Sequence, residues 1–315
     1  METENLKSRH SIFPDDPQQI FHEISHTISL INADFDFDFL EKVYSDTERL
    51  FQGKYPGYRA CNTKYHNLEH TTSVTLAAAR LTHGGYLEGH QFSRKNILLT
   101  LVATLFHDVG LVQTEEEVEG TGAKFTIGHE ERSIVFMKQY LSLKKISDQD
   151  LDNCSQFIRC TILNLSTKEI PFISEETETL GKIVGSADLL AQMADRYYLE
   201  KLLLLFKEFE EARLPDLDSE LVLLKKTEEF YEFVAQRRLS EELSSVSLFM
   251  RPHFLNRWGI DRDLYGESIS RNLEYLKSLI VKCEESFTCY LEELRRGGIA
   301  KEVGLSLKKV EESGD

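Results

Sequence analysis

Hydrophobic residues recur along most of the chain at the spacing of three or four positions that is typical of amphipathic helices. Ile20, Ile24, Ile28 and Ile31 would share one helical face, and no stretch shows the sustained apolar–polar alternation of a strand. The pattern therefore predicts an all-α fold. Helices are expected over residues 20–31 and 39–50, through the apolar residues 74–81 as far as the glycine pair 84–85, and over residues 94–108, 129–143, 148–163, 175–193, 196–212, 217–250 and 263–294.

The expected helices suggest one main domain. Residues 20–212 should form a compact core, and the helices of residues 213–298 should pack on this core within the same domain. Residues 1–19 are interpreted as an N-terminal extension and residues 299–315 as a tail. The acidic segment Gln113–Gly122 is the clearest loop, and it is either a mobile flap or an ordinary solvated loop.

The charge of the chain limits its partners. Among 315 residues there are 37 Lys and Arg against 53 Asp and Glu, a formal net charge of −16. This charge disfavours non-specific binding to nucleic acid or anionic membrane, because phosphate contacts need clustered basic side chains. The longest apolar run, residues 97–106, is about half of a membrane span and is expected to be a buried helix. The N-terminus lacks the apolar region of a signal peptide, so a cytoplasmic protein is expected.

The cysteines do not suggest a cross-linked or zinc-bound scaffold. There are five of them, an odd number, and none lies in a C-x-x-C pair. Reduced thiols are therefore expected, rather than a disulfide framework or a thiolate zinc site.

Three short stretches place histidines and acids in apolar surroundings. The stretch CNTKYHNLEHTTSV holds His66 and His70, which would lie on one face if the segment is helical. An apolar helix runs into His107-Asp108 in LFHDVG, and Asp188 interrupts another in GSADLL. Each feature alone has a structural explanation, such as capping or a bond to a neighbouring amide. Together they supply nitrogen and oxygen ligands that suit a divalent metal ion.

These stretches, in this order, resemble the motifs of the HD-domain superfamily of metal-dependent phosphohydrolases. More narrowly, YHNLEH at residues 65–70 resembles the Y-H-N-x-x-H motif of cyclic nucleotide phosphodiesterase catalytic domains. Residues 55–63 (YPGYRACNT) are similar to the segment that precedes this motif in bacterial relatives. The resemblance covers roughly residues 20–200, and it implies a compact multi-helix, phosphodiesterase-like bundle.

The resemblance also implies roles for individual residues. His70, His107, Asp108 and Asp188 match the four protein ligands of the first metal ion, and Asp108 would also bridge to a second ion. His66 matches the histidine that protonates the leaving oxygen, while a metal-activated hydroxide attacks the phosphorus. The implied cofactor is a divalent metal, with two ions of Mg, Mn, Fe or Zn expected.

The sequence departs from the phosphodiesterase motif after the HD pair. Where that family has H-D-x-x-H, this chain has Leu111. His129 is either a replacement for the missing histidine at the second metal or the phosphate, or an ordinary histidine near a helix N-terminus that bonds to water. Tyr65 and Asn67 are further candidates for substrate or second-metal contacts. Glu69 is a candidate to orient the imidazole of His66.

One more stretch mixes arginine with aromatic residues. Residues 249–258 read FMRPHFLNRW and contain the only tryptophan. They could stack a base or bind a phosphate, or they could pack a C-terminal helix onto the body of the protein. The packing interpretation is preferred.

The sequence therefore predicts a phosphohydrolase that acts on a small-molecule phosphodiester or phosphomonoester, with a cyclic nucleotide as the first candidate substrate. The alternatives are a nucleotidase, another phosphohydrolase of the same superfamily, or a non-catalytic sensor that binds nucleotide through a metal pocket. The presence of His66 favours an enzyme, since a binding module needs no proton donor for a leaving group. Whether the protein forms a homodimer is left open.

Overall fold

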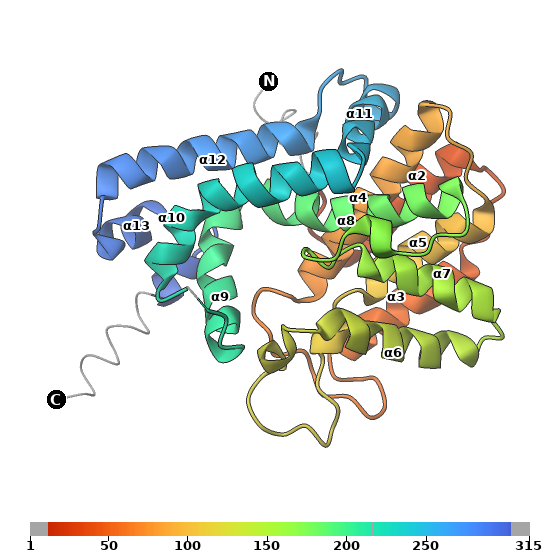
Figure 1. Cartoon of the computed structure of the whole chain (residues 1–315), viewed down its shortest axis with the longest axis horizontal. Helices are drawn as coiled ribbons and strands as arrows, with labels where there is room; N and C mark the ends of the chain where they lie inside the picture. Colours follow the sequence, from red (N-terminus) through yellow and green to blue (C-terminus); the bar gives the residue numbers. More distant parts are fainter. Residues whose placement is uncertain (1–11, 216, 304–315) are drawn as a thin grey trace.

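The computed structural model describes residues 12–215 and 217–303, and helices dominate this part of the chain (Figure 1). No strand occurs in it, and its only β pairing consists of two isolated bridges, Gln52 with Ala60 and Tyr58 with Thr114. The predicted all-α class is confirmed. The α-helices are α2 (Pro17–Ile31), α3 (Asp38–Phe51), α4 (Leu68–Leu87), α5 (Arg94–Phe106), α6 (His129–Ser142), α7 (Asp148–Arg159), α8 (Glu175–Ala194), α9 (Tyr198–Glu211), α10 (Glu220–Phe230), α11 (Met250–Trp258), α12 (Leu264–Cys283) and α13 (Phe287–Glu293).

Two helices, α4 and α8, form the centre of the molecule. They pack against each other, and α4 also contacts α2, α5 and α11 while α8 contacts α7 and α12. Almost every residue of α4 from His70 to Gly85 is buried, so this helix has no solvent-exposed face over that length. A helix surrounded by protein on all sides can present polar side chains only to other protein groups or to a bound ligand.

The remaining helices gather at the two ends of this centre. Figure 1 shows α9, α10, α12 and α13 together at one end of the long axis, and α3, α5, α6 and α7 at the other. Buried side chains from both groups belong to one contiguous hydrophobic core. The apolar run at residues 97–106 lies in α5, where it is a buried core helix as predicted. No described helix is both long enough and apolar enough to cross a lipid bilayer.

The glycine pair in α4 does not end the helix, contrary to the prediction. The helix continues through Gly84 and Gly85 to Leu87. A Cβ atom on Gly84 would lie 1.8 Å from the carbonyl oxygen of Phe249, and one on Gly85 would lie 3.1 Å from the Phe249 ring. The two glycines therefore allow the C-terminal part of the chain to pack directly on α4.

Two of the predicted long helices are interrupted. Between α10 and α11 the chain forms π-helical turns at Tyr231–Ala235 and Arg238–Glu242, followed by a turn in which Ser244 and Ser245 are left-handed (φ 52° and 57°). The helix expected over residues 263–294 breaks at Glu284, which has φ 48°. Left-handed residues other than glycine carry no clear signal in the sequence, so the hydrophobic pattern runs across both breaks.

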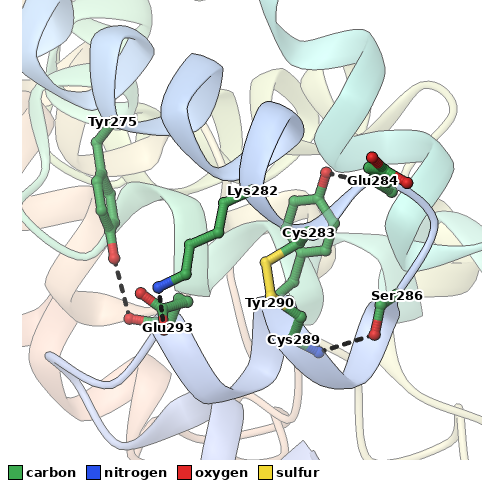
Figure 2. The surroundings of a disulfide bond; sticks show 8 residues. All are labelled: Tyr275, Lys282, Cys283, Glu284, Ser286, Cys289, Tyr290 and Glu293. Carbon is green, nitrogen blue, oxygen red and sulfur yellow. Dashed lines mark hydrogen bonds and ion pairs between the residues drawn. A yellow bond between two sulfur atoms is a disulfide. The ribbon is translucent and has the colours of Figure 1, made fainter.

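The break at Glu284 explains a second wrong prediction, because Cys283 and Cys289 form a disulfide across it (Figure 2). Six positions of a continuous helix would separate the two sulfurs by about 9 Å along the axis. The turn instead brings the start of α13 back against the end of α12. The other cysteines, Cys61, Cys154 and Cys160, are free thiols as predicted.

The predicted terminal extensions are shorter than expected. Helix α2 begins at Pro17, behind the N-cap Asp16, and Phe13 packs against the rings of Phe254 and Tyr265. At the other end Ala300 is buried. The rest of the two predicted segments, residues 1–11 and 304–315, lies outside the described residues.

The acidic loop at residues 113–122 is anchored at both ends. Gln113 is buried and its amide oxygen accepts a hydrogen bond from Asn62 at 2.8 Å. Thr121 donates through both its backbone N–H and its hydroxyl group to the carboxylate of Glu211. Between these ends Val118 is exposed. The loop is thus exposed in its middle and fixed by hydrogen bonds at both ends.

The arginine- and aromatic-rich segment packs a helix onto the body, as preferred. His253 and Phe254 of α11 are completely buried. Arg257 pairs with Glu23 of α2 at 3.1 Å, and Arg251 pairs with Asp261 at 2.7 Å. The basic side chains of this segment are therefore already engaged by carboxylates.

Candidate metal and active site

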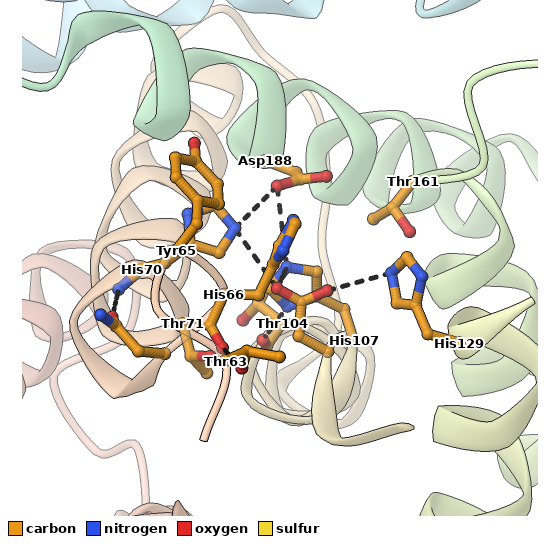
Figure 3. Close-up of polar contacts among 12 residues, drawn as sticks. Thr63, Tyr65, His66, His70, Thr71, Thr104, His107, His129, Thr161 and Asp188 are labelled. Carbon is orange, nitrogen blue, oxygen red and sulfur yellow. Dashed lines mark hydrogen bonds and ion pairs between the residues drawn. The ribbon is translucent and has the colours of Figure 1, made fainter. Parts of the chain in front are cut away.

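Four predicted ligands from three helical regions meet at one point (Figure 3). His70 comes from the first turn of α4, His107 and Asp108 follow α5, and Asp188 comes from the middle of α8. The Nε2 atom of His70 lies 3.4 Å from Oδ2 of Asp108 and 3.1 Å from Oδ1 of Asp188. The Nε2 atom of His107 lies 3.2 Å and 3.6 Å from the same two oxygens. The geometry brings together all four residues assigned to the first metal.

Unpaired ligand atoms support a metal ion at this point. The Nδ1–H group of His107 donates to the backbone oxygen of Thr104 at 2.7 Å, which leaves Nε2 to face the cluster. This Nε2 atom and Oδ2 of Asp108 are buried and have no hydrogen-bond partner in the described part of the chain. Buried polar atoms without partners are costly. Two imidazole nitrogens and two carboxylates are a donor set suited to a divalent ion, so the residues fit such a group.

The charges of the site shift the pKa values of its buried acids and of His107. Burial alone would raise the pKa of the Asp108 carboxyl, but His107, His129 and His66 together lower it well below its usual range. Burial lowers the pKa of His107, and Asp108 and Asp188 more than reverse this effect. Burial would also raise the pKa of the Asp188 carboxyl, but His107 and His70 lower it below its usual range, so both carboxyl groups are ionised, as carboxylate ligands must be.

Helix α7 packs very closely against α8 just before Asp188. A Cβ atom on Gly185 would lie 2.3 Å from the backbone oxygen of Cys160, at the end of α7. The small residues before Asp188 thus let α7 pack against α8. They do not open space for a ligand at that point.

His129 lies beside Asp108, where the sequence suggested a replacement for the histidine missing at Leu111. Its Nε2 atom is 3.2 Å from Oδ1 of Asp108, and its Nδ1–H group donates to the backbone oxygen of Thr126 at 2.8 Å. Burial lowers the pKa of His129, but the bond to Asp108 and its charge raise the pKa to about 9. Leu111 itself is buried in the core.

Gly110 allows this approach of His129 to Asp108. A Cβ atom on Gly110 would lie 2.0 Å from the backbone oxygen of His129. The N–H group of Gly110 donates to the hydroxyl oxygen of Ser133 at 2.9 Å, and that hydroxyl donates to the backbone oxygen of His107 at 2.6 Å. The first turn of α6 is therefore fixed directly on the HD segment.

His66 lies outside the helix that carries His70, contrary to the prediction that they share a helical face. Asn67 is the N-cap of α4, and its side-chain oxygen accepts from the N–H group of His70 at 3.1 Å. Its amide group donates to the backbone oxygen of Lys64 at 3.1 Å. Asn67 thus caps α4, and both polar groups of its side chain are engaged in backbone hydrogen bonds. The rings of His66 and His70 still lie close, with centroids 5.7 Å apart.

Glu208 of α9 orients His66, and the sequence did not reveal it. Its Oε2 atom lies 2.5 Å from Nδ1 of His66, while its Oε1 atom accepts from the backbone N–H of Tyr65 at 2.6 Å. Only 4% of its side chain is exposed. Burial lowers the pKa of His66, but the bond to Glu208 and the charge of Asp108 produce a net increase. Glu208 lies in the acid-rich stretch KEFEE, where no local pattern distinguishes it from its neighbours.

Glu69 does not contact His66, contrary to expectation. It pairs instead with Lys201 of α9 at 2.9 Å. Lys201 also pairs with Asp195 at 2.5 Å. The lysine therefore connects α4, the end of α8 and α9 at the edge of the site.

Tyr65 packs against the two histidines. Its ring centroid lies 4.8 Å from that of His66 and 5.6 Å from that of His70, and the residue is buried. Its contacts make it a wall of the site, so the structure gives no support to a substrate contact through its hydroxyl group.

Comparison with known proteins gives one partial match. The family described as Npun_R2479-like matches residues 114–246, which is less than half of the chain. This part contains His129, Asp188 and Glu208 but not His66, His70, His107 or Asp108. No curated protein and no solved structure matches the chain. Over residues 114–246, the chain is similar to the Npun_R2479-like family.

Proposed function

We propose that the protein is a metal-dependent phosphohydrolase that cleaves a small-molecule phosphate ester. One observation carries the proposal. A histidine that is not part of the ligand set, His66, lies beside that set with its Nδ1 atom 2.5 Å from the buried carboxylate of Glu208. A pocket that only bound metal would not need such a pair.

The ligands of the ion in this proposal are His70, His107, Asp108 and Asp188. A divalent ion bound there would supply Lewis acidity toward the phosphoryl oxygens and would activate water as a nucleophile. His129 lies on the other side of Asp108 and would bind a phosphoryl oxygen or a second ion. The distance of 3.2 Å between Nε2 of His129 and Oδ1 of Asp108 is compatible with both roles.

His66 is the proposed proton donor to the leaving oxygen. Its Nδ1–H group would donate to Glu208, which fixes the ring and leaves Nε2 to face the substrate. The raised pKa favours the protonated imidazole, which is the form that a general acid needs. Its side chain is 17% exposed, so it is accessible from the site while mostly desolvated.

The first candidate substrate is a cyclic nucleotide, which is the substrate class of the family whose Y-H-N-x-x-H motif residues 65–70 resemble. Breaking the ring of such a diester releases an alkoxide with a high pKa, and this leaving group requires a proton. The chemistry of the His66–Glu208 pair therefore suits an alkyl phosphodiester better than an ester with a good leaving group.

Turnover assays test the proposal. The full-length protein is incubated with Mn²⁺ or Mg²⁺ and a panel of cyclic nucleotides, nucleoside monophosphates and p-nitrophenyl phosphate esters. His66→Ala should lower kcat by about 10²–10⁴-fold for alkyl esters and less for p-nitrophenyl esters, with His22→Ala, an exposed histidine of α2, as the control. An equal loss for both classes of leaving group would contradict the proton-donor role. Absence of turnover on the whole panel would refute the proposed function.

A further inference from the structure

The disulfide between Cys283 and Cys289 has no role in the proposed hydrolysis, but it links two helices at the turn between them. Helix α12 ends at Cys283, Glu284 reverses the chain, and Ser286 caps α13, which carries Cys289 in its first turn. Figure 2 shows the two sulfurs joining the ends of the two helices. The bond closes a segment with a sequence separation of only six.

The disulfide is accessible to small thiols from one side. Cys283 is buried, but Cys289 is partly exposed and the turn residues 284–286 are exposed. Of the free cysteines, Cys154 and Cys160 are buried in the core. A small thiol or disulfide would therefore reach Cys289 before Cys283 or the core thiols of Cys154 and Cys160.

Helix α13 depends on its attachment to α12. It has seven residues, too few for a stable isolated helix. Its last residue, Glu293, pairs with Lys282 at 2.9 Å, and the backbone oxygen of the same residue accepts from the hydroxyl group of Tyr275 at 3.0 Å. The disulfide is the covalent connection at the opposite, N-terminal end of the helix.

The segment after α13 contacts the start of α9. The backbone N–H of Gly297 donates to Oε1 of Glu200 at 2.6 Å, and a Cβ atom on Gly297 would lie 3.0 Å from the ring of Tyr197. Glu200 is buried, and its other oxygen has no hydrogen-bond partner among the described residues. Gly297 thus donates the hydrogen bond to Oε1 of Glu200, and this bond joins the segment after α13 to the first turn of α9.

The same helix holds Glu208 against His66 at its other end. Eight residues separate Glu200 from Glu208, about 12 Å along the helix axis. A rigid helix of this length transmits a shift at its first turn to the residues near its end. The Cys283–Cys289 pair and the proposed proton donor are therefore connected by a continuous series of contacts.

We propose that Cys283 and Cys289 form a reversible redox modification site that controls how firmly α9 holds Glu208 against His66. In the reduced protein, the Cys289 thiolate attacks a small-molecule disulfide, forms a mixed disulfide and releases one thiol. Cys283 then attacks the Cys289 sulfur and releases the second thiol. The two cysteines lose two electrons and two protons, and the small-molecule disulfide gains them. A small thiol reverses both steps.

The oxidised form holds α13 and Gly297 in place, whereas the reduced form loosens them and so loosens the start of α9. The effect on catalysis rests on the proposed function, but the effect on α9 does not. The two consequences can therefore be measured separately.

Hydrogen exchange tests the effect on α9. The full-length protein is equilibrated in glutathione buffers of fixed thiol-to-disulfide ratio, and alkylation with mass spectrometry counts the free thiols. In oxidising buffer, amides of residues 197–211 and 287–300 should exchange at least about tenfold more slowly than in reducing buffer, because the cross-link removes chain freedom. Cys283→Ser/Cys289→Ser should show the same exchange in both buffers. Glu200→Ala should still form the disulfide, but its α9 amides should no longer respond.

The outcomes distinguish this inference from the proposed function. If the two thiols stay free at every buffer ratio, or if the disulfide forms while exchange in α9 is unchanged, the redox site is overturned. A protein that shows the exchange difference but hydrolyses no phosphate ester supports the redox site and refutes the proposed function. An active protein whose rate and exchange are both independent of the buffer overturns the redox site alone.

Discussion

The Oε2 atom of Glu208 lies 2.5 Å from the Nδ1 atom of His66, although 142 positions of the chain separate the two residues. The same carboxylate accepts from the backbone N–H groups of Tyr65 and His66. It therefore fixes both the loop before α4 and the imidazole ring within that loop. The position of His66 depends on α9 and not on the helix that carries His70.

Replacing Glu208 by Gln should lower activity without removing metal. The amide keeps a hydrogen-bonding oxygen for the backbone groups but removes the negative charge beside the imidazole. We expect kcat to fall by about 10- to 100-fold while elemental analysis finds wild-type metal content. Glu210→Gln, on the exposed side of the same helix, is the control and should keep its rate. Loss of metal from Glu208→Gln would show that the carboxylate supports the ligands instead of His66.

Replacing Asp108 by Ala should remove metal and activity together. Asp108 lies within 3.4 Å of His70 and His107 through one oxygen, and within 3.2 Å of His129 through the other. Its loss would remove the carboxylate common to all three histidines. Elemental analysis after gel filtration provides the measurement, with the surface variant Asp152→Ala as the control. Full metal content in Asp108→Ala would disprove the ligand assignment.

Gly110→Ala should lower both the stability of the protein and its affinity for metal, whereas Gly84→Ala should lower only the stability. In both variants the new Cβ would overlap a backbone oxygen, that of His129 in the first and that of Phe249 in the second. We expect each to lose about 1–3 kcal/mol of unfolding free energy in urea titrations, as overpacking does. Only Gly110→Ala should also weaken metal binding, because it displaces the turn that follows His107 and Asp108. Equal metal affinity in the two variants would contradict this account.

Acidification should destabilise the protein through a second pair of histidines, which lies outside the candidate site. The Nδ1 atoms of His83 and His253 lie 3.0 Å apart, and both residues are buried. Burial, reinforced by the charge of Arg257, lowers the pKa of His83 to about 4. The unfolded chain therefore binds more protons than the folded one between about pH 6.5 and pH 4. This contribution to the free energy of unfolding is fully present above the window and is lost as the pH falls through it.

A variant isolates this contribution to stability. Between pH 7 and pH 5 the His83 site should cost about 2 kcal/mol of unfolding free energy. His83→Gln removes the titrating group and should reduce the pH dependence by about that amount in urea titrations, while the exposed control His22→Gln should not. If His83→Gln keeps the full pH dependence, another group is responsible for the acid sensitivity.

The meeting of His70, His107, Asp108 and Asp188 could be predicted because they lie in short stretches with a local signature. His107 and Asp108 follow a buried apolar helix, and Asp188 interrupts another. A charged group in an apolar helix needs a partner, and several such groups in one protein suggest that they share an ion. The helical class followed from the hydrophobic spacing for the same reason, since that spacing is a property of neighbouring residues.

The features that sequence could not reveal all depend on contacts between distant segments. Glu208 resembles the surface acids beside it until α9 is packed against Tyr65. Gly84 reads as a helix end until Phe249 is placed against it. The disulfide partners appear to belong to one helix until Glu284 breaks that helix. In each case local preference was overruled by packing that no short window of sequence contains.

The position of α9 has a consequence for the order in which the site is completed during synthesis. When Asp188 has left the ribosome, every proposed metal ligand has already been made, but the carboxylate that orients His66 has not. The residues proposed to bind the ion therefore precede the residue that orients the proposed proton donor along the chain. Assembly of the metal ligands and orientation of the proton donor would then be separate steps, and the second would need the folding of α9.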